Sequence, residues 1–481
     1  MKTEVSGTHS IKSNIFFNLL KTFLSLIFPL ITFPYVSRVL TPVGVGNVNY
    51  ASSIVSYFVM FAGLGIGVYG IREGAKVRDD KQKLTELICE LLIITFVAML
   101  VAYIAFFIVV FTVPQFAEFR ALLLVLGANI FFNVIGIEWL YSALEEFRYI
   151  TIRSFCFQLL SLVLIFTLVK TPDDFFKYAV ITVVSASGSN VFNFLHARRF
   201  LDWRLVHHLD WGRHIKSILI MFGMTMTGSI LTMMDTTMVG LISGTYQVGL
   251  YTTALKIVKL ICNLIAVLSA TLLPRCSYYF KSGDMEKFNA LMEQGVFVTL
   301  FLAVPAVLLV IVNANLIIFI LSGSLYMDSV PCIKVLAPII AFSSLTLLIN
   351  YQLLLPQGKE KVNLIVLIIG TGIDFILNVI LIPNWQAMGA CFGTFAAEAV
   401  MVCINFFFLL RHLGVKRLFN SSFPIALGTA AFILALNYTP RIEFGVHWNS
   451  VIASFFGGFL YVLVICLVCR KRIGALVRRR K

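Results

Sequence analysis

The chain has 481 residues, of which 59% are hydrophobic and 13% are charged. An ordinary soluble domain is about 25% charged and about 45–50% apolar, so this composition excludes a soluble protein. The formal net charge is +15 at pH 7. It does not indicate nucleic-acid binding, because no soluble basic domain is left to hold it. The composition predicts an all-α, polytopic membrane protein.

Apolar runs separated by short polar or Pro- and Gly-containing segments predict about fourteen transmembrane helices. In chain order, the predicted spans cover residues 11–36, 47–71, 84–111, 116–143, 151–169, 175–196, 215–242, 248–273, 290–321, 330–355, 362–382, 387–410, 423–436 and 450–469. The number is even, so we expect both termini on one side of the membrane. The connectors are too short to hold a folded catalytic domain, and we do not expect an enzyme.

The positions of the basic residues orient the predicted bundle, because Lys and Arg in short loops stay on the cytoplasmic side. Of the 38 Lys and Arg residues, 29 fall in the termini or in segments on the same side, and 4 fall on the opposite side. We therefore expect both termini to be cytoplasmic. The remaining basic residues lie within or near the ends of spans, and these are informative about function.

A weak internal repeat relates the two halves of the chain. A shift of 203 residues aligns identical residues: Val45 with Val248, Gly46 with Gly249, and Arg72 with Arg275. Parallel repeats of this kind are common in transporters, with the substrate path between the lobes. We expect an N-lobe of six helices at 1–205, a C-lobe of six helices at 206–415, and two further helices with a basic tail at 416–481.

The stretch Gly65-Ile66-Gly67-Val68-Tyr69-Gly70 has the spacing of a dinucleotide-binding loop. It lies inside a predicted span, whereas that loop needs a strand before it and a helix after it. We interpret these glycines, with Gly63, as points of close helix packing. The sequence holds no Walker loop, HExxH or GxSxG motif. We expect no cofactor and no metal site, and coupling to protons or sodium stays open.

Polar residues at helical spacing form stripes on two predicted spans. Such residues face other helices or a wet cavity, because hydrocarbon cannot satisfy them. The stripes comprise Asn14, Asn18, Lys21, Ser25 and Thr32 in the first span, and Thr252, Lys256, Lys259 and Asn263 in the eighth. We expect these stripes to line one central cavity. The alternatives are hydrogen bonds between helices for the hydroxyl and amide groups, and snorkelling to the interface for Lys21.

Three acidic residues lie well inside spans: Asp235, Asp374 and Glu398. An ionisable group at the centre of a span costs about 2.5–3.5 kcal/mol on insertion scales, so these are candidates for coupling or gating. Hydrogen bonding inside the C-lobe is the alternative for Asp374 and Glu398. Glu138 and Trp139 lie at the predicted cytoplasmic end of span 116–143, and we interpret them as interfacial anchors.

A set of short stretches carries a family resemblance across essentially the whole chain. They are Phe33-Pro34-Tyr35-Val36-Ser37-Arg38-Val39-Leu40, Gly44-Val45-Gly46, Tyr69-Gly70-Ile71-Arg72-Glu73, Glu145-Glu146-Phe147-Arg148-Tyr149-Ile150-Thr151-Ile152-Arg153, Asp235 and Gly358-Lys359-Glu360-Lys361. In their order and spacing, the sequence resembles the Wzx-like polysaccharide flippases of the multidrug/oligosaccharidyl-lipid/polysaccharide exporter superfamily.

The resemblance implies a carrier in the bacterial inner membrane that exports O-antigen or capsule repeat units linked to undecaprenyl pyrophosphate. It implies movement from the cytoplasmic to the outer leaflet by alternating access. The expected partners are the lipid-linked oligosaccharide, membrane lipids and polysaccharide polymerase machinery, with no nucleic acid, and we expect a monomer.

A pyrophosphate headgroup needs cationic partners in a path of low dielectric constant. The candidates for this role are Arg72, Arg275, Lys21, Lys256, Lys259 and Arg38. We expect Arg72 and Arg275 to capture the headgroup and the three lysines to hold it. Sugar hydroxyls need many weak polar partners, and the candidates are Asn14, Asn18, Ser25, Thr252 and Asn263.

Two other functions remain as alternatives. A multidrug-type cation antiporter of the same superfamily would need acidic residues, whereas the polar stripes hold several lysines. A membrane-embedded glycan polymerase or ligase would be expected to carry a large external loop with catalytic Arg or His. The longest predicted external segment, 437–449, holds one Arg and one His.

Overall fold

A computed structural model describes residues 11–202, 206, 209–438 and 446–478. The described residues form helices and turns without a strand. Ten helices are long and apolar enough to cross a membrane, or up to twelve if each of two bent helix pairs is one span. The predicted class of all-α, polytopic membrane protein is thereby confirmed. The chain forms two compact units, Met1–Gly249 and Leu250–Lys481.

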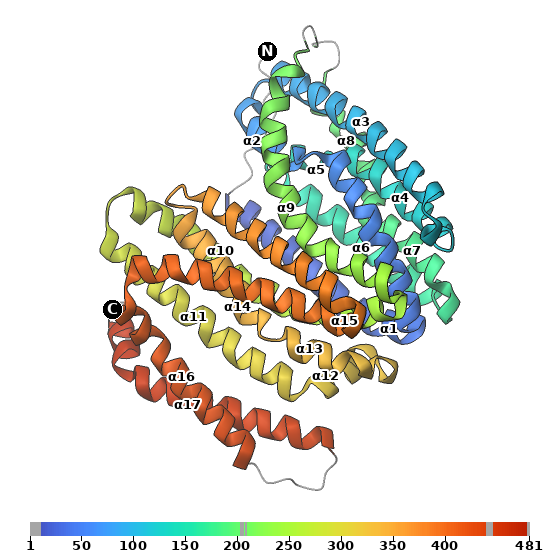
Figure 1. Cartoon of the computed structure of the whole chain (residues 1–481). Coiled ribbons are helices and arrows are strands. Elements are labelled where there is room, and N and C mark those ends of the chain that lie inside the picture. The colour runs from blue at the N-terminus through green and yellow to red at the C-terminus, as the bar shows by residue number, and fades with distance from the viewer. Residues whose placement is uncertain (1–10, 203–205, 207–208, 439–445, 479–481) are drawn as a thin grey trace. The chain divides into compact units, whose positions relative to one another are not determined.

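The first unit consists of long helices that pack on the N-terminal helix (Figure 1). Its helices are α1 (Ile11–Gly63), α2 (Ile66–Val77), α3 (Lys81–Thr112), α4 (Arg120–Ile135), α5 (Glu138–Ala143), α6 (Phe147–Leu168), α7 (Phe175–Val183), α8 (Ser189–Ala197) and α9 (Gly212–Ser243), followed by the start of α10 (Thr245–Lys281). Helix α9 contacts α1 and α2 and belongs to this unit. The lobe boundaries expected from the repeat stay a prediction.

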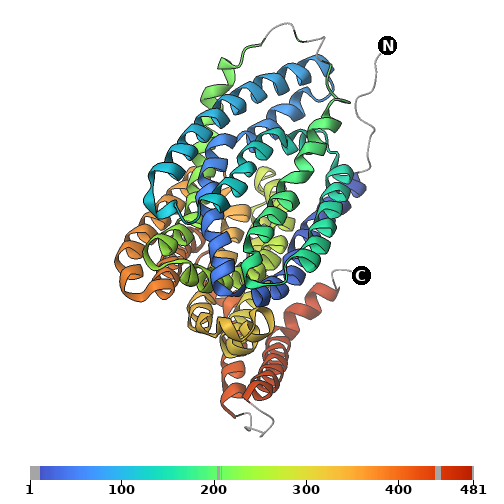
Figure 2. The ribbon, with the colours of Figure 1, turned by 90° about the vertical axis from the view of Figure 1, so that its right-hand side faces the viewer.

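The second unit contains the rest of α10 and seven further helices. These are α11 (Met285–Val312), α12 (Ala314–Ser322), α13 (Val330–Leu336), α14 (Ile339–Ile349), α15 (Glu360–Leu413), α16 (Val415–Tyr438) and α17 (Val446–Arg478). Helices α16 and α17 lie side by side in Figures 1 and 2 and share an apolar core that includes Phe432 and Tyr461. The Tyr461 hydroxyl donates to the Phe301 carbonyl of α11, 3.2 Å away.

Two of the candidate spans are much longer than a bilayer requires. Phe16–Val77 covers 62 residues and Glu360–Leu413 covers 54. A span needs only about 20. Each contains a residue with non-helical backbone angles, Thr41 in the first and Gln386 in the second. If each of these two long helices is counted as two spans, the upper count of twelve becomes the predicted fourteen. The number fourteen stays a prediction. A further break at Leu64 and Gly65 interrupts the predicted span 47–71.

The backbone of the first unit repeats a feature after 203 residues. Thr41 has φ 60° and ψ 172°, and Gly244 has φ 83° and ψ 170°. These positions coincide under the shift that aligns Gly46 with Gly249. A Cβ on Gly46 would lie 1.8 Å from the Thr245 carbonyl oxygen, and one on Gly249 would lie 2.0 Å from that of Pro42. The two glycines therefore form a reciprocal crossing in which no side chain fits, and this geometry supports the internal repeat.

The glycines that imitate a nucleotide-binding loop have different surroundings. A Cβ on Gly70 would lie 2.4 Å from the Trp139 ring, so the predicted close packing is confirmed there. A Cβ on Gly67 would have no neighbouring atom within 4 Å, so the interpretation of close helix packing is wrong for this residue. Trp139 is only 8% exposed, because it packs against Gly70 and Gly74. It is a core residue rather than the interfacial anchor that we expected.

Candidate functional site

An ion pair joins the N-terminal helix to the break between α4 and α5. The Lys21 ammonium contacts the Glu138 carboxylate, although the residues are 117 positions apart in the chain. Their side chains are 35% and 45% exposed. Helix α4 ends at Ile135, and Ile137 has φ 33°, which turns the chain so that Glu138 begins α5. The predicted headgroup residue Lys21 therefore has a carboxylate partner in the first unit.

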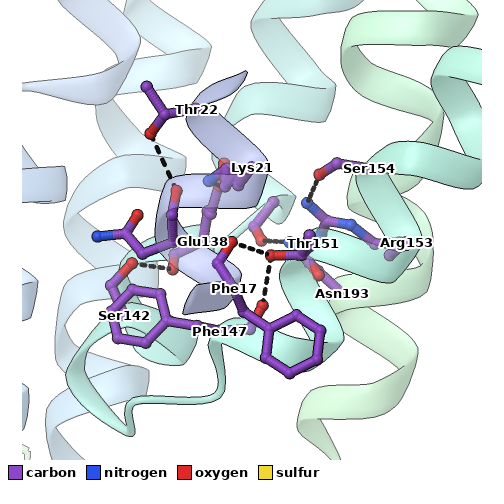
Figure 3. Close-up of polar contacts among 12 residues, drawn as sticks. Phe17, Lys21, Thr22, Glu138, Ser142, Phe147, Thr151, Arg153, Ser154 and Asn193 are labelled. Carbon is purple, nitrogen blue, oxygen red and sulfur yellow. Dashed lines mark hydrogen bonds and ion pairs between the residues drawn. The ribbon is translucent and has the colours of Figure 1, made fainter. Parts of the chain in front are cut away.

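Next to this pair, α6 brings a buried arginine to the same region (Figure 3). The Thr151 hydroxyl lies 3.0 Å from the Phe17 carbonyl of α1 and 2.8 Å from the Phe147 carbonyl of its own helix. Arg153 is 8% exposed, and its Nη2 lies 3.5 Å from the Ser154 hydroxyl. Its Nε and Nη1 have no hydrogen-bond partner among the described residues. Buried donors without partners are rare, because each costs about 1–3 kcal/mol.

Arg72 lies above a buried hydrogen-bond network. Its guanidinium is 5.4 Å from the centre of the Tyr69 ring, and its Nε donates to Glu73 over 2.9 Å. The Tyr69 hydroxyl is 2.6 Å from His214 Nδ1, and His214 Nε2 is 2.7 Å from the fully buried Glu90 carboxylate. Arg213 Nη2 donates to the same Glu90 carboxylate over 2.7 Å, so this buried acid has a cationic partner. This network fixes the ring on which Arg72 rests.

The predicted coupling residue Asp235 lies inside the first unit on α9. It is 2% exposed. Two residues later on the same helix, the Thr237 hydroxyl lies 2.9 Å from the Ser53 hydroxyl of α1. Asp235 therefore lies beside a polar contact between α1 and α9.

In the second unit, a second lysine–glutamate pair includes two predicted residues. Lys259 Nζ on α10 lies 3.3 Å from Glu398 Oε1 on α15. The Lys259 side chain is 38% exposed, whereas that of Glu398 is 9% exposed. Lys256, one turn earlier, is exposed. The structure therefore brings Lys259 together with Glu398, which the sequence analysis had placed in separate roles.

The third predicted acid, Asp374, lies deeper in the second unit. It is fully buried on α15, and its Oδ1 accepts from the Asn378 side chain over 3.3 Å. A Cβ on Gly393 would lie 2.3 Å from Asn378 Oδ1 and 3.0 Å from Asp374 Oδ1. The break at Gln386 lets the second half of α15 pack its glycine on this pair. Hydrogen bonding inside the second unit, one of the two expected roles, is present.

The other predicted residues are dispersed. Arg38, Arg275, Asn18, Ser25 and Asn263 are exposed, and Thr252 is half-buried. The Ser25 hydroxyl donates to the Thr22 carbonyl of its own helix, 2.7 Å away. Arg38 follows Lys21 by 17 residues on one helix, which is about 25 Å of rise, so the two cannot hold one headgroup together. The side chain of Asn14 lies outside the described residues.

Sequence reasoning missed three charged residues. Glu138 was interpreted as an anchor, Arg153 was named only in a stretch that carries the family resemblance, and Glu90 was not singled out. A signal was available for Glu90, because an acid six residues inside a predicted apolar span needs a partner. For Arg153 the position two residues into the predicted span 151–169 was the only hint.

The N-terminal half and more of this chain matches a known family model. The model described as "Polysaccharide biosynthesis protein" matches residues 11–280, and the model "MatE" matches residues 220–380. The first match covers more than half of the chain. This chain belongs to the polysaccharide biosynthesis protein family.

Individual relatives and structures agree with this membership. Over 411 residues, this chain is 21% identical to the "Putative O-antigen transporter" of Escherichia coli (strain K12), and the match covers 83% of this chain and 97% of the relative. It is 22% identical to the "Capsular polysaccharide biosynthesis protein CapF" of Staphylococcus aureus, with 78% and 93% covered. Its fold resembles the inward closed "Lipid II flippase MurJ" with a TM-score of 0.77 at 15% identity, covering 95% of this chain and 100% of that one.

Proposed function

We propose that this protein is a flippase for lipid-linked oligosaccharides. It moves undecaprenyl-pyrophosphate-linked repeat units from the cytoplasmic to the outer leaflet for surface polysaccharide synthesis. The main support for this proposal is the family match over residues 11–280. Similarity over most of the chain to a putative O-antigen transporter and to a capsular polysaccharide protein adds to it. The fold it shares with a lipid II flippase supports the same class of cargo.

The cationic groups inside the helices suit an anionic headgroup. Lys21 and Lys259 each lie within a candidate span and each pairs with a carboxylate, and a phosphate can replace the exposed Glu138 carboxylate on Lys21. Arg153 adds a buried guanidinium with unused donors. We propose that Arg72 and Arg275 capture the headgroup at the cytoplasmic side, where both termini lie, and that Lys21, Lys256 and Lys259 hold it during movement.

The membrane potential can drive alternating-access transport of this cargo without nucleotide hydrolysis. With the cell interior negative, moving an anion outward is favoured by about 2.3 kcal/mol per charge per 100 mV. Return of an empty cationic site is favoured by the same field. Asp235, Asp374 and Glu398 are the acids available for ion coupling, and we propose a carrier in a bacterial inner membrane rather than an enzyme.

Deletion of the gene followed by analysis of lipid-linked intermediates tests this function. The proposal predicts loss of surface glycan and accumulation of lipid-linked repeat units on the cytoplasmic face. An unchanged lipid-linked pool combined with loss of drug efflux would instead identify a multidrug-type antiporter. Normal surface glycan when Lys256 and Lys259 are both changed to Ala, with protein levels intact, would remove these lysines from the site.

A further inference from the structure

Two basic residues, Lys21 and Arg153, lie near Glu138 in the first unit. Lys21 contacts Glu138, and Arg153 is buried nearby on α6. A buried guanidinium without a full set of partners is costly, because burial removes its hydration. Lys21 and Arg153 therefore offer an ammonium group and two unused guanidinium donors to a further anion.

The two cations are held in register by a contact between their helices. Thr151, two residues before Arg153, hydrogen-bonds the carbonyl of Phe17, one turn before Lys21. In Figure 3, Lys21 and Glu138 lie on one side of Thr151 and Arg153 on the other. The arrangement therefore belongs to the packing of α1 on α6 and does not depend on the long side chains alone.

Glu138 is placed so that it can leave this pair. Its side chain is 45% exposed, and ion pairs of such exposure are worth about 0.2–1 kcal/mol. It also lines a cavity of about 150 Å³ whose other lining residues include Thr95 and Asn133. The Asn133 amide group is a donor for a displaced carboxylate, whereas the Thr95 hydroxyl already donates to the Leu91 carbonyl over 2.8 Å. The strained Ile137, at φ 33°, sits directly before Glu138 in a two-residue helix break.

We propose that Glu138 is a counter-anion built into the transport site. In the empty protein it occupies Lys21, and an incoming diphosphate displaces it and binds Lys21 and Arg153 together. This inference rests on the proposed function, because it assumes a diphosphate cargo. It assigns Arg153 as a headgroup-binding residue and Glu138 as the group that sets how tightly the headgroup is held.

The exchange explains why a carrier keeps an acid beside its anion site. Without Glu138, Lys21 and Arg153 would hold a diphosphate more tightly, since no carboxylate would compete with it or repel it. If the bound cargo and the transition state of transport are stabilised equally, the cargo is released more slowly and its movement across the membrane is not faster. Removing the carboxylate should therefore raise affinity and lower the transport rate.

Binding of farnesyl diphosphate to the purified full-length protein tests this proposal. Glu138→Gln should bind the probe about tenfold more tightly than the wild type, because a competing like charge is removed. Arg153→Gln should bind about tenfold more weakly, because one of two cations on the headgroup is lost. Glu118→Gln is the matched control, since Glu118 is exposed outside these contacts, and it should bind as the wild type does.

The outcomes separate this inference from the proposed function. If the wild type binds the probe and Glu138→Gln binds it equally or more weakly, the counter-anion role is wrong while the diphosphate cargo stands. If no variant binds, wild type included, the diphosphate cargo and the inference both fail. Glu138→Asp guards against misfolding, because it keeps the charge and should retain wild-type affinity within about threefold.

Discussion

Each unit has a lysine–glutamate pair that joins two of its helices, Lys21–Glu138 and Lys259–Glu398, and these pairs differ in the burial of the acid. Glu138 in the first unit is 45% exposed, whereas Glu398 in the second is 9% exposed. An exposed carboxylate gives up its partner at little cost, but a buried one left unpaired is strongly destabilising. The same pair of residue types therefore makes an exchangeable site in one unit and a structural contact in the other.

Removing Lys21 should have the largest effect on transport. Lys21→Ala is expected to lower export by about 100-fold, because the headgroup loses a charged partner, while stability changes by less than about 1 kcal/mol. Surface glycan and thermal unfolding of the purified protein measure the two effects. Lys83→Ala is the control, because the Lys83 side chain is 68% exposed and pairs with Asp80 at the start of α3. Wild-type export by Lys21→Ala would remove Lys21 from the site.

Removing Lys259 should instead act on stability. Lys259→Ala leaves Glu398 buried without its ion-pair partner, and we expect a loss of about 3 kcal/mol in the free energy of unfolding. Adding Glu398→Gln should restore most of this loss, since the amide carries no charge. Thermal unfolding of the single and double variants measures it. A Lys259→Ala protein as stable as the wild type would abolish the distinction between the two pairs.

Around Gly46, α1 is held by close contact with the backbone at Thr245, whereas around Lys21 it is held by an exposed ion pair. Gly46→Ala places a Cβ 1.8 Å from the Thr245 carbonyl oxygen, and overpacking of this kind costs about 2 kcal/mol. Gly67→Ala is the matched control, since nothing lies within 4 Å of its Cβ, and it should be neutral or stabilising by about 0.5 kcal/mol. Unfolding midpoints compare the two. Equal midpoints would show that the crossing is not tight.

A third ion pair, in which both side chains are exposed, should contribute least to the free energy of unfolding. Arg78 Nη1 lies 2.8 Å from Glu145 Oε1, and both side chains are exposed, at 39% and 49%. Arg78→Ala should cost less than about 1 kcal/mol, and added salt should reduce even that effect. Unfolding at two salt concentrations measures it. A loss comparable to that of Lys259→Ala would mean that burial does not decide the strength of these pairs.

The helical class and the flippase family could be predicted from the sequence, but the composition of the site could not. Apolar runs alone indicate helices, whereas nothing local reports that residue 21 meets residue 138. Glu138 and Trp139 were interpreted together as anchors, yet the first pairs with a lysine and the second packs on Gly70. The breaks at Thr41 and Gln386 lie in connectors that the sequence predicts, between spans 11–36 and 47–71 and between spans 362–382 and 387–410. The break at Leu64 and Gly65 was missed, because hydropathy does not report the backbone angles of single residues.

We expect this protein to move a diphosphate-linked glycan and to use Lys21 to do so. Purified protein in liposomes, with a fluorescent oligosaccharide on undecaprenyl diphosphate and a quencher added outside, measures that movement directly. The wild type should exchange the probe between leaflets, and Lys21→Ala should be no faster than protein-free liposomes. A wild-type protein that moves the probe no faster than protein-free liposomes would contradict this expectation.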